Sequence, residues 1–433
     1  MNRRVFLRTS AGLLVRPFAP GVWAGEAPPP SKRRFDFQPY RSDAAIVPVT
    51  RVTPEDGYYI HTYYDTCPWS PSGRFLATSR LPYQDHNAVF GDTAELCLID
   101  LREQTIETLY RTRVWGFQTG TNANWGGSDR YIYTNDMVEG VACCARIDTV
   151  TREVRLFAGP QYNVSPDDTY VVGFPLELMD VTQPGYGAPS RDPQHPQSLP
   201  PGASKTEGLW RTDLAVNRKR LIASLADFAA RIPEPPPRPG GTWYLWHTKH
   251  NRTGTRLLQI TRTLFPDGWG GRNTIVFTLR PDGSDIRYLP TQPLFGTDGG
   301  HPNWHGDGEH IIRNLPIAGK TRLCQWRWDG SDFRILSEKL EGGGHPRIEP
   351  RGRWVVTDAF RGDQLILRLL DLRNGAEEAV CRIRTIDKKK LADSTLRLDG
   401  HPAFSRDFQK VCFQAAPEGK RQLFIADLRS LLG

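Results

Sequence analysis

Residues 300–308 read GHPNWHGDG, and the same pattern returns as GHPRIEPRG at 344–352 and as GHPAFSRDF at 400–408. Each copy begins with a small residue, continues through an aromatic or apolar position, and reaches a tight turn just before an apolar run. Four earlier copies read TCPWSPSG at 66–73, NANWGGSD at 122–129, QYNVSPDD at 161–168 and HTKHNRTG at 247–254. Seven copies along one chain indicate a repeat architecture.

The segments between the copies indicate what each repeat contains. They hold pairs of short apolar runs joined by turn residues, and the Asp-Gly pairs at 282–283 and 329–330 are strong hairpin signals. Each repeat therefore predicts a four-stranded antiparallel blade, and the whole predicts an all-β, seven-bladed β-propeller. The last repeat is one strand short, so we expect residues 46–52 to supply that strand and close the ring. The long gap between 168 and 254 predicts an insertion near 176–242.

The overall composition agrees with this class. The 433 residues include 40 Gly, 35 Pro and 12 Trp but only 3 Met, as expected for many turns and short strands. Length alone allows two or three domains, whereas the repeat predicts one ring over residues 45–433. The chain has no stretch of about 18 apolar residues, so we predict no membrane-spanning helix.

The N-terminus resembles a twin-arginine export signal. Arg3 and Arg4 are followed by Val-Phe-Leu-Arg, a mildly apolar stretch and small residues near Ala24. We therefore expect a signal peptide over residues 1–24, a flexible linker over 25–44, and a periplasmic or secreted protein. Removing residues 1–24 lowers the net charge from +8 to about +4. That excess of positive charge suits an anionic substrate but is too small to indicate nucleic-acid binding. The oligomeric state remains open.

The seven cysteines do not suggest a disulfide framework. Their number is odd, no C-x-x-C pair occurs, and most lie inside apolar runs such as Leu96-Cys97-Leu98. A chain of this length also needs no disulfides to build a core. We expect the cysteines to be small buried side chains.

The position seven residues before each turn carries an unusual set of residues. It reads Thr66, Asn122, Gln161, His247, His301, His345 and His401, so four of the ten histidines share one position in successive blades. Equivalent positions of a propeller lie at one height around the channel, so these side chains should converge near one mouth. Converging imidazoles predict a divalent-metal site. Alternatively, each His-Pro pair only packs or caps a turn.

Other residues join the candidate site with less support. Asn122 and Gln161 share the histidine position and could contact a substrate. Arg80, Arg262 and Arg313 lie at the far ends of the following strands, where a guanidinium could bind a carboxylate, or could pair with a neighbouring acid. His61, Tyr63, Tyr64 and Tyr186 are candidate acid or base groups that could equally be packing residues. No serine-hydrolase, zinc-protease, P-loop or dinucleotide motif occurs in the sequence.

The repeats around Trp69 and the three Gly-His-Pro copies resemble those of oligogalacturonate lyases, over residues of about 57–430. That resemblance implies a seven-bladed propeller that cleaves acidic polysaccharides by β-elimination, with a divalent metal, manganese in the type case, on a histidine cluster. Zn²⁺ and Ca²⁺ are the alternatives. It further implies that His301 and His401 bind the metal, with His345 between them, and that a histidine base and an arginine assist.

The same resemblance predicts the base after the strand of the fourth repeat. Here that strand reads RLLQITR over 256–262 and contains no histidine. The resemblance thus leaves His247 or His250 as the base, with Arg262 neutralising the uronate carboxylate. The repeat is also similar to that of periplasmic TolB-type propellers, which implies the alternative function of a non-catalytic module that binds a protein or a glycan.

Overall fold

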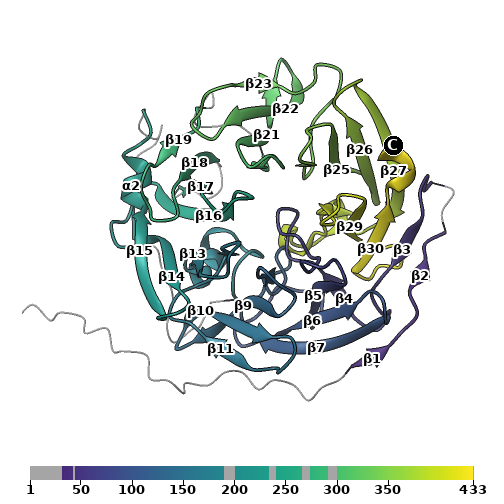
Figure 1. Cartoon of the computed structure of the whole chain (residues 1–433), viewed down its shortest axis with the longest axis horizontal. Helices are drawn as coiled ribbons and strands as arrows, with labels where there is room; N and C mark the ends of the chain where they lie inside the picture. The colour runs from purple at the N-terminus through teal and green to yellow at the C-terminus, as the bar shows by residue number, and fades with distance from the viewer. Residues whose placement is uncertain are drawn as a thin grey trace, which may run out of the picture.

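The computed structural model describes residues 32–41, 44–189, 200–233, 240–265, 274–290 and 300–432. It forms seven antiparallel sheets arranged as blades around a central axis, which confirms the seven-bladed propeller (Figure 1). The expected signal peptide at 1–24 lies outside these residues.

The strands of the first four blades follow the repeats in chain order. Blade 1 has β4 (Tyr58–Ile60), β5 (Phe75–Leu81), β6 (Ala94–Asp100) and β7 (Thr105–Thr112); blade 2 has β8 (Asn124–Trp125), β9 (Tyr131–Val138), β10 (Val141–Asp148) and β11 (Val154–Leu156); blade 3 has β12 (Asn163–Val164), β13 (Tyr170–Gly173), β14 (Gly208–Asp213) and β15 (Arg218–Ser224); blade 4 has β16 (Thr242–His250), β17 (Leu257–Leu264), β18 (Ile275–Leu279) and β19 (Arg287–Tyr288).

The last three blades complete the ring. Blade 5 has β20 (Asn303–Trp304), β21 (His310–Ile317), β22 (Lys320–Arg327) and β23 (Arg334–Ile335); blade 6 has β24 (Arg347–Ile348), β25 (Trp354–Arg361), β26 (Gln364–Asp371) and β27 (Ala376–Arg384); blade 7 has β28 (Ala403–Phe404), β29 (Lys410–Ala415) and β30 (Gln422–Asp427). The helices are short: α1 (Met179–Thr182), α2 (Leu225–Ala229), α3 (Arg429–Leu432), and the 3-10 turns Leu176–Leu178, Lys388–Lys390 and Ser394–Leu396.

The turn that ends six of the seven repeats has a common backbone geometry. Gly73, Gly254, Gly308 and Gly352 have φ between +70° and +78°, and each donates its N–H to the carbonyl three residues earlier. Asp168 and Phe408 form the same bond with φ of 58° and 61°. A left-handed residue is what lets the inner strand reverse into the next strand, which explains the glycines at four of these positions.

Large apolar residues pack between neighbouring blades. Trp69, Trp125, Trp304 and Phe404 occupy the position four residues before the turn, and all are buried. The indole N–H of Trp125 donates to the Pro68 carbonyl of blade 1 at 2.8 Å, and that of Trp304 donates to the Lys249 carbonyl of blade 4 at 3.0 Å. This position therefore joins blades, as the repeat predicts.

The N-terminal segment closes the ring. β3 (Val49–Arg51) pairs antiparallel with β30, within the expected closing segment 46–52. The expected linker over 25–44 is partly ordered, however: β1 (Arg33–Arg34) pairs with β7, and β2 (Gln38–Pro39) pairs with β3. Both pairings cover an outer blade edge that would otherwise expose unpaired backbone groups.

The expected insertion near 176–242 is not continuous. The two outer strands of blade 3, β14 and β15, lie inside it, together with α2. The long connection is therefore the one from Gly173 to Gly208, and it carries α1 and Tyr186. None of the helices in the described part of the chain has the length and hydropathy of a membrane span.

Candidate functional site

The repeated histidine position lies at the start of the innermost strand of each blade. Asn122, Gln161, His301, His345 and His401 each stand two residues before a short inner strand, and His247 lies at an irregularity of β16 between Trp246 and Thr248. Asn122, His247, His301 and His401 have φ between +45° and +58°. Non-glycine residues seldom adopt this conformation, and such strain gathers at functional sites.

His61 is a fifth histidine of this ring. In blade 1, Ile60 pairs with Ser79 and Trp69 pairs with Leu76. In blade 5, Gly300 bonds to Asn314 and Trp304 pairs with Ile311, at the matching positions. His61 therefore corresponds to His301, whereas the spacing of the sequence places Thr66 there. The difference arises because residues 61–67 form an inserted loop inside the inner strand, which shifts the count. The loop brings Tyr63, Tyr64 and Asp65 into the channel.

The imidazoles of the ring are in mutual contact. The ring centroids of His301 and His345 are 4.1 Å apart, and those of His345 and His401 are 4.5 Å apart. Tyr63 links this group to His247, since its ring stacks on His247 at 4.6 Å and meets His401 at 4.3 Å. Four histidines of the predicted column thus converge at one site.

Three side chains of this group offer ligand atoms at one point. His345, Asp399 and His401 each present a ring nitrogen or carboxylate oxygen, all within 4.8 Å of one another. The Nδ1 atom of His345 lies 2.9 Å from Asp358, and the Nδ1 atom of His401 lies 2.9 Å from the Gln414 amide. His401 Nε2 is buried and has no hydrogen-bond partner in the described residues.

Burial favours a neutral His401, and neighbouring charges favour an ionised Asp399. Burial lowers the pKa of His401 well below 6.5, and the neighbouring His345 adds to the effect. Burial opposes ionisation of Asp399, but Arg397 and Lys388 hold the pKa of that carboxyl well below its usual range. A carboxylate beside neutral imidazoles is the state that binds a divalent cation.

The inserted loop closes the channel below these histidines. Lys249 forms a salt bridge to Asp65 at 2.8 Å between two buried side chains, and its ammonium also donates to the Tyr64 hydroxyl and the Pro302 carbonyl. Arg347 donates to the Tyr64 carbonyl at 2.9 Å. These contacts from blades 4, 5 and 6 fix the loop, so Tyr63 is held in the centre of the ring.

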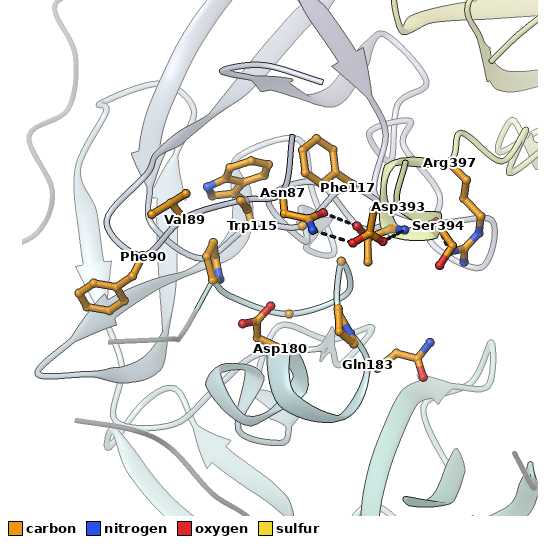
Figure 2. A pocket seen from close by; sticks show the side chains of 17 residues that line it. Asn87, Val89, Phe90, Trp115, Phe117, Asp180, Gln183, Asp393, Ser394 and Arg397 are labelled. Atoms are coloured by element: carbon orange, nitrogen blue, oxygen red, sulfur yellow. Dashed lines mark hydrogen bonds between the residues drawn. The ribbon is translucent and has the colours of Figure 1, made fainter. Parts of the chain in front are cut away.

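A cavity of about 600 Å³ opens on the same face (Figure 2). Val89, Phe90, Trp115 and Phe117 line one side of it, and Asp180 and Gln183 lie across from them. Arg397 stands at its edge and donates to Asp399 at 2.9 Å and to the Tyr186 hydroxyl at 2.5 Å. The cavity therefore adjoins the histidine cluster through Arg397.

The remaining candidates lie at different distances from this centre. Arg262 donates to Gln183, which lines the cavity, at 3.1 Å, and its guanidinium stacks on Trp246. Tyr186 contacts both Tyr63 and His247. Asn122 and Gln161 are bonded to each other rather than placed in the cavity lining, because the Asn122 amide donates to the Gln161 carbonyl at 2.9 Å.

Three candidates are not gathered at the histidine cluster. His250 is held by Asn163 at 2.7 Å and by the Tyr170 hydroxyl at 3.2 Å, and it lines a cavity at the other end of the inner strands. Arg80 pairs with Glu95 beside an outer cavity of blade 1. Arg313 is buried in β21, where burial lowers its pKa to about 10.

The sequence reasoning did not select Asp399 or Arg397. Both precede the seventh copy of the repeat, in the stretch Arg397-Leu398-Asp399-Gly400-His401. Arg397 and Asp399 alternate just before the repeat histidine His401, and this charged pair is the sequence signal that marks them. All seven cysteines are free, and all but Cys67 are buried, as expected.

The buried histidines predict how stability depends on pH in the metal-free protein. Burial lowers the pKa of His61 from 6.5 to about 4, so the unfolded chain takes up a proton at a higher pH than the folded chain. The stabilising contribution is complete above about pH 6.5 and is lost as the pH falls toward 4, by roughly 3 kcal/mol at 1.36 kcal/mol per unit.

Urea unfolding of the EDTA-treated protein between pH 7.5 and 4.5 measures this dependence. His61→Gln should flatten the slope of stability against pH, whereas His86→Gln, at an exposed ring, serves as the control. Equal slopes for wild type and His61→Gln would contradict the assignment.

Comparison of the whole chain with known proteins gives matches in structure alone. No protein-family model and no curated protein matches the sequence. An oligogalacturonate lyase in complex with manganese superposes with a TM-score of 0.66 at 18% identity, over 92% of this chain and 98% of that one. An oligogalacturonate lyase from Vibrio parahaemolyticus gives 0.65 at 16% identity, with the same coverage.

A TolB from Acinetobacter baumannii also matches, with a TM-score of 0.37 at 13% identity, over 83% of this chain and 78% of that one. The chain is thus a seven-bladed propeller similar in fold to the oligogalacturonate lyases. At these identities the likeness shows a shared fold, and the chemistry must be argued from the site.

Proposed function

We propose that this protein is a metal-dependent lyase that cleaves uronic-acid-containing saccharides by β-elimination at the His345–Asp399–His401 cluster. The observation that carries the proposal is the buried Nε2 of His401, which has no hydrogen-bond partner among the described residues. His401 shares a group of ligand atoms with His345 and Asp399, on a propeller similar in fold to the oligogalacturonate lyases. A buried polar atom without a partner calls for an explanation, and a metal ion is one.

The donor set fits a divalent metal. His345, His401 and Asp399 would hold it, and two imidazoles with one carboxylate suit Mn²⁺ or Zn²⁺ better than Ca²⁺, which prefers oxygen ligands. Asp358 accepts the Nδ1 proton of His345 and so directs Nε2 toward the cluster. When bound, the metal supplies Lewis acidity that stabilises negative charge on the uronate carboxylate.

The chain's own residues supply binding and proton transfer. Arg397 stands at the edge of the cavity, where its guanidinium would meet a uronate carboxylate. Arg262 donates to Gln183, which lines the same cavity. His247 is the proposed base, because its Nε2 has no hydrogen-bond partner among the described residues while Tyr162 holds its Nδ1. With the Tyr162 hydroxyl accepting from Nδ1–H, Nε2 keeps the lone pair that would remove the proton on C5.

His247→Asn should therefore lower kcat about 100-fold or more, the usual contribution of a general base, with a smaller change in KM. His250→Asn is the matched control, since His250 lies three residues away, is held by Asn163 and Tyr170, and should retain most of the activity. The activities of both variants are measured by the ultraviolet absorbance of the unsaturated product, with polygalacturonate, alginate, ulvan and glycosaminoglycans as substrates. Manganese-loaded wild type that is silent on all four would contradict the proposed function.

We also propose that the protein is exported through the twin-arginine route, on the basis of residues 1–24. A folded export route would carry a metal loaded in the cytoplasm across the membrane with the protein. Replacement of Arg3 and Arg4 by lysine should retain the protein in the cytoplasmic fraction, as measured by fractionation. Arg16→Lys should leave export unchanged, and export of the double variant at the wild-type level would contradict the assignment.

A further inference from the structure

A second layer of polar side chains lies below the histidine ring. Side chains two residues apart on a strand point to the same side, so the residues two positions after the ring also face the channel. Their strand pairings place them at equivalent positions of five successive blades. They are Asn124, Asn163, Lys249, Asn303 and Arg347.

All five of these residues line one cavity of about 330 Å³ at the other end of the inner strands. The cavity reaches Trp125, Trp304 and Phe404 on its walls, and none of the ring histidines or Tyr63 lines it. The loop at 61–67 separates the two sites, since Tyr63 contacts the histidines while Asp65, Thr66 and Cys67 line this second cavity. It is therefore a site distinct from the proposed metal centre.

The lining of this cavity is strongly positive. It includes four cationic side chains and a single carboxylate, Asp65. That carboxylate is already paired with Lys249 at 2.8 Å. Arg252, Arg347 and Arg406 have no carboxylate partner in the described part of the chain. The lining of the cavity thus carries more positive than negative side chains.

The guanidinium groups of Arg347 and Arg406 remain available for a ligand. Arg347 uses one nitrogen on the Tyr64 carbonyl. Among the described residues, Arg406 donates to the Trp69 carbonyl alone, at 3.0 and 3.2 Å. Both arginines line this one cavity, from blades 6 and 7. Guanidinium groups that line one cavity can bind carboxylate, sulfate or phosphate oxygens.

We propose that this opposite mouth of the channel is a second, metal-independent binding site for a small oxyanion, held by Arg347 and Arg406. The shared chemistry is a carboxylate or sulfate oxygen pair. Such an oxygen pair can come from a sugar acid or from an inorganic anion. For a sugar acid, the asparagines would bond to the sugar hydroxyls and Trp304 would contact the sugar ring. The cavity volume is at the lower end of the usual range for small-molecule sites.

The test uses the full chain carrying His401→Ala and treated with EDTA, so that binding at the metal centre is removed. Galacturonate, sulfate and galactose are titrated by calorimetry and by tryptophan fluorescence, because Trp125 and Trp304 line the cavity. We expect galacturonate to bind and galactose not to bind. Binding of sulfate as well would identify the site as a general oxyanion site, whereas its absence would assign the site to sugar acids.

Arg347→Gln and Arg406→Gln should each weaken anion binding at least 10-fold, and Arg102→Gln, at an exposed arginine outside the cavity, should not. Arg406→Gln keeps the test valid if Arg347→Gln disturbs the loop that it holds. Failure of both anions to bind, or unchanged affinity in both variants, would overturn the proposal. This result does not depend on metal content or lyase activity, so the oxyanion site and the proposed lyase function can fail independently.

Discussion

His401→Ala should abolish both metal binding and elimination while the propeller stays folded. His401 Nε2 has no hydrogen-bond partner among the described residues, so the variant removes a ligand atom and, with it, the hydrogen bond between Nδ1 and the Gln414 amide. Removal of a residue that only orients a metal ligand already lowers metal affinity or activity about 10–100-fold. We therefore expect more than about 100-fold loss of activity for His401→Ala, and about 10–100-fold for Asp358→Asn, which acts through His345.

Mass spectrometry of bound manganese per chain and the ultraviolet assay measure the two effects. His86→Ala is the control, because His86 is an exposed histidine and should keep full metal and activity. Near-ultraviolet circular dichroism reports whether the variant keeps its packed aromatic residues. A His401→Ala protein that retains one manganese per chain would show that the metal binds elsewhere.

Lys249→Met should destabilise the protein by about 3–5 kcal/mol, because it leaves the Asp65 carboxylate buried without its partner. The side chains of Lys249 and Asp65 are only 6% and 4% exposed, so solvent solvates the remaining carboxylate poorly. Burial lowers the pKa of Lys249, but the adjacent carboxylate favours its charged form. The loss should appear as a lower midpoint of urea unfolding.

The double variant Lys249→Met/Asp65→Leu separates the charge effect from packing. Replacement of both members by apolar residues of similar size is often nearly neutral, so we expect it to recover most of the lost stability. The exposed pair Arg33–Asp56, 44% and 50% exposed, gives the comparison: Arg33→Met should cost no more than about 1 kcal/mol. A Lys249→Met protein within 1 kcal/mol of wild type would contradict a role for this pair in fixing the loop.

Much of the fold was predictable because local sequence specifies turns. The left-handed turn that follows the inner strand in six of the blades requires Gly, or a residue that tolerates the same φ, and this requirement marks the register of those blades. Once the register is known, the blade-joining positions of Trp125 and Trp304 and the shared position of His301, His345 and His401 follow. The closing strand was predictable for a similar reason, since a ring with one strand missing leaves an open edge.

What the local sequence did not specify is which groups meet across blades. His61 belongs to the ring, but the loop at 61–67 shifts its blade out of the common spacing. Asp399 joins His345 because Asp358 links blades 6 and 7, with hydrogen bonds to both His345 and the Gly400 N–H. The sequence by itself determined a seven-bladed ring with converging histidines, because periodic turns are a local property. The tertiary structure alone decided the ligand set, the buried Lys249–Asp65 pair and the positive cavity at the opposite mouth, because these depend on distances between residues far apart in the chain.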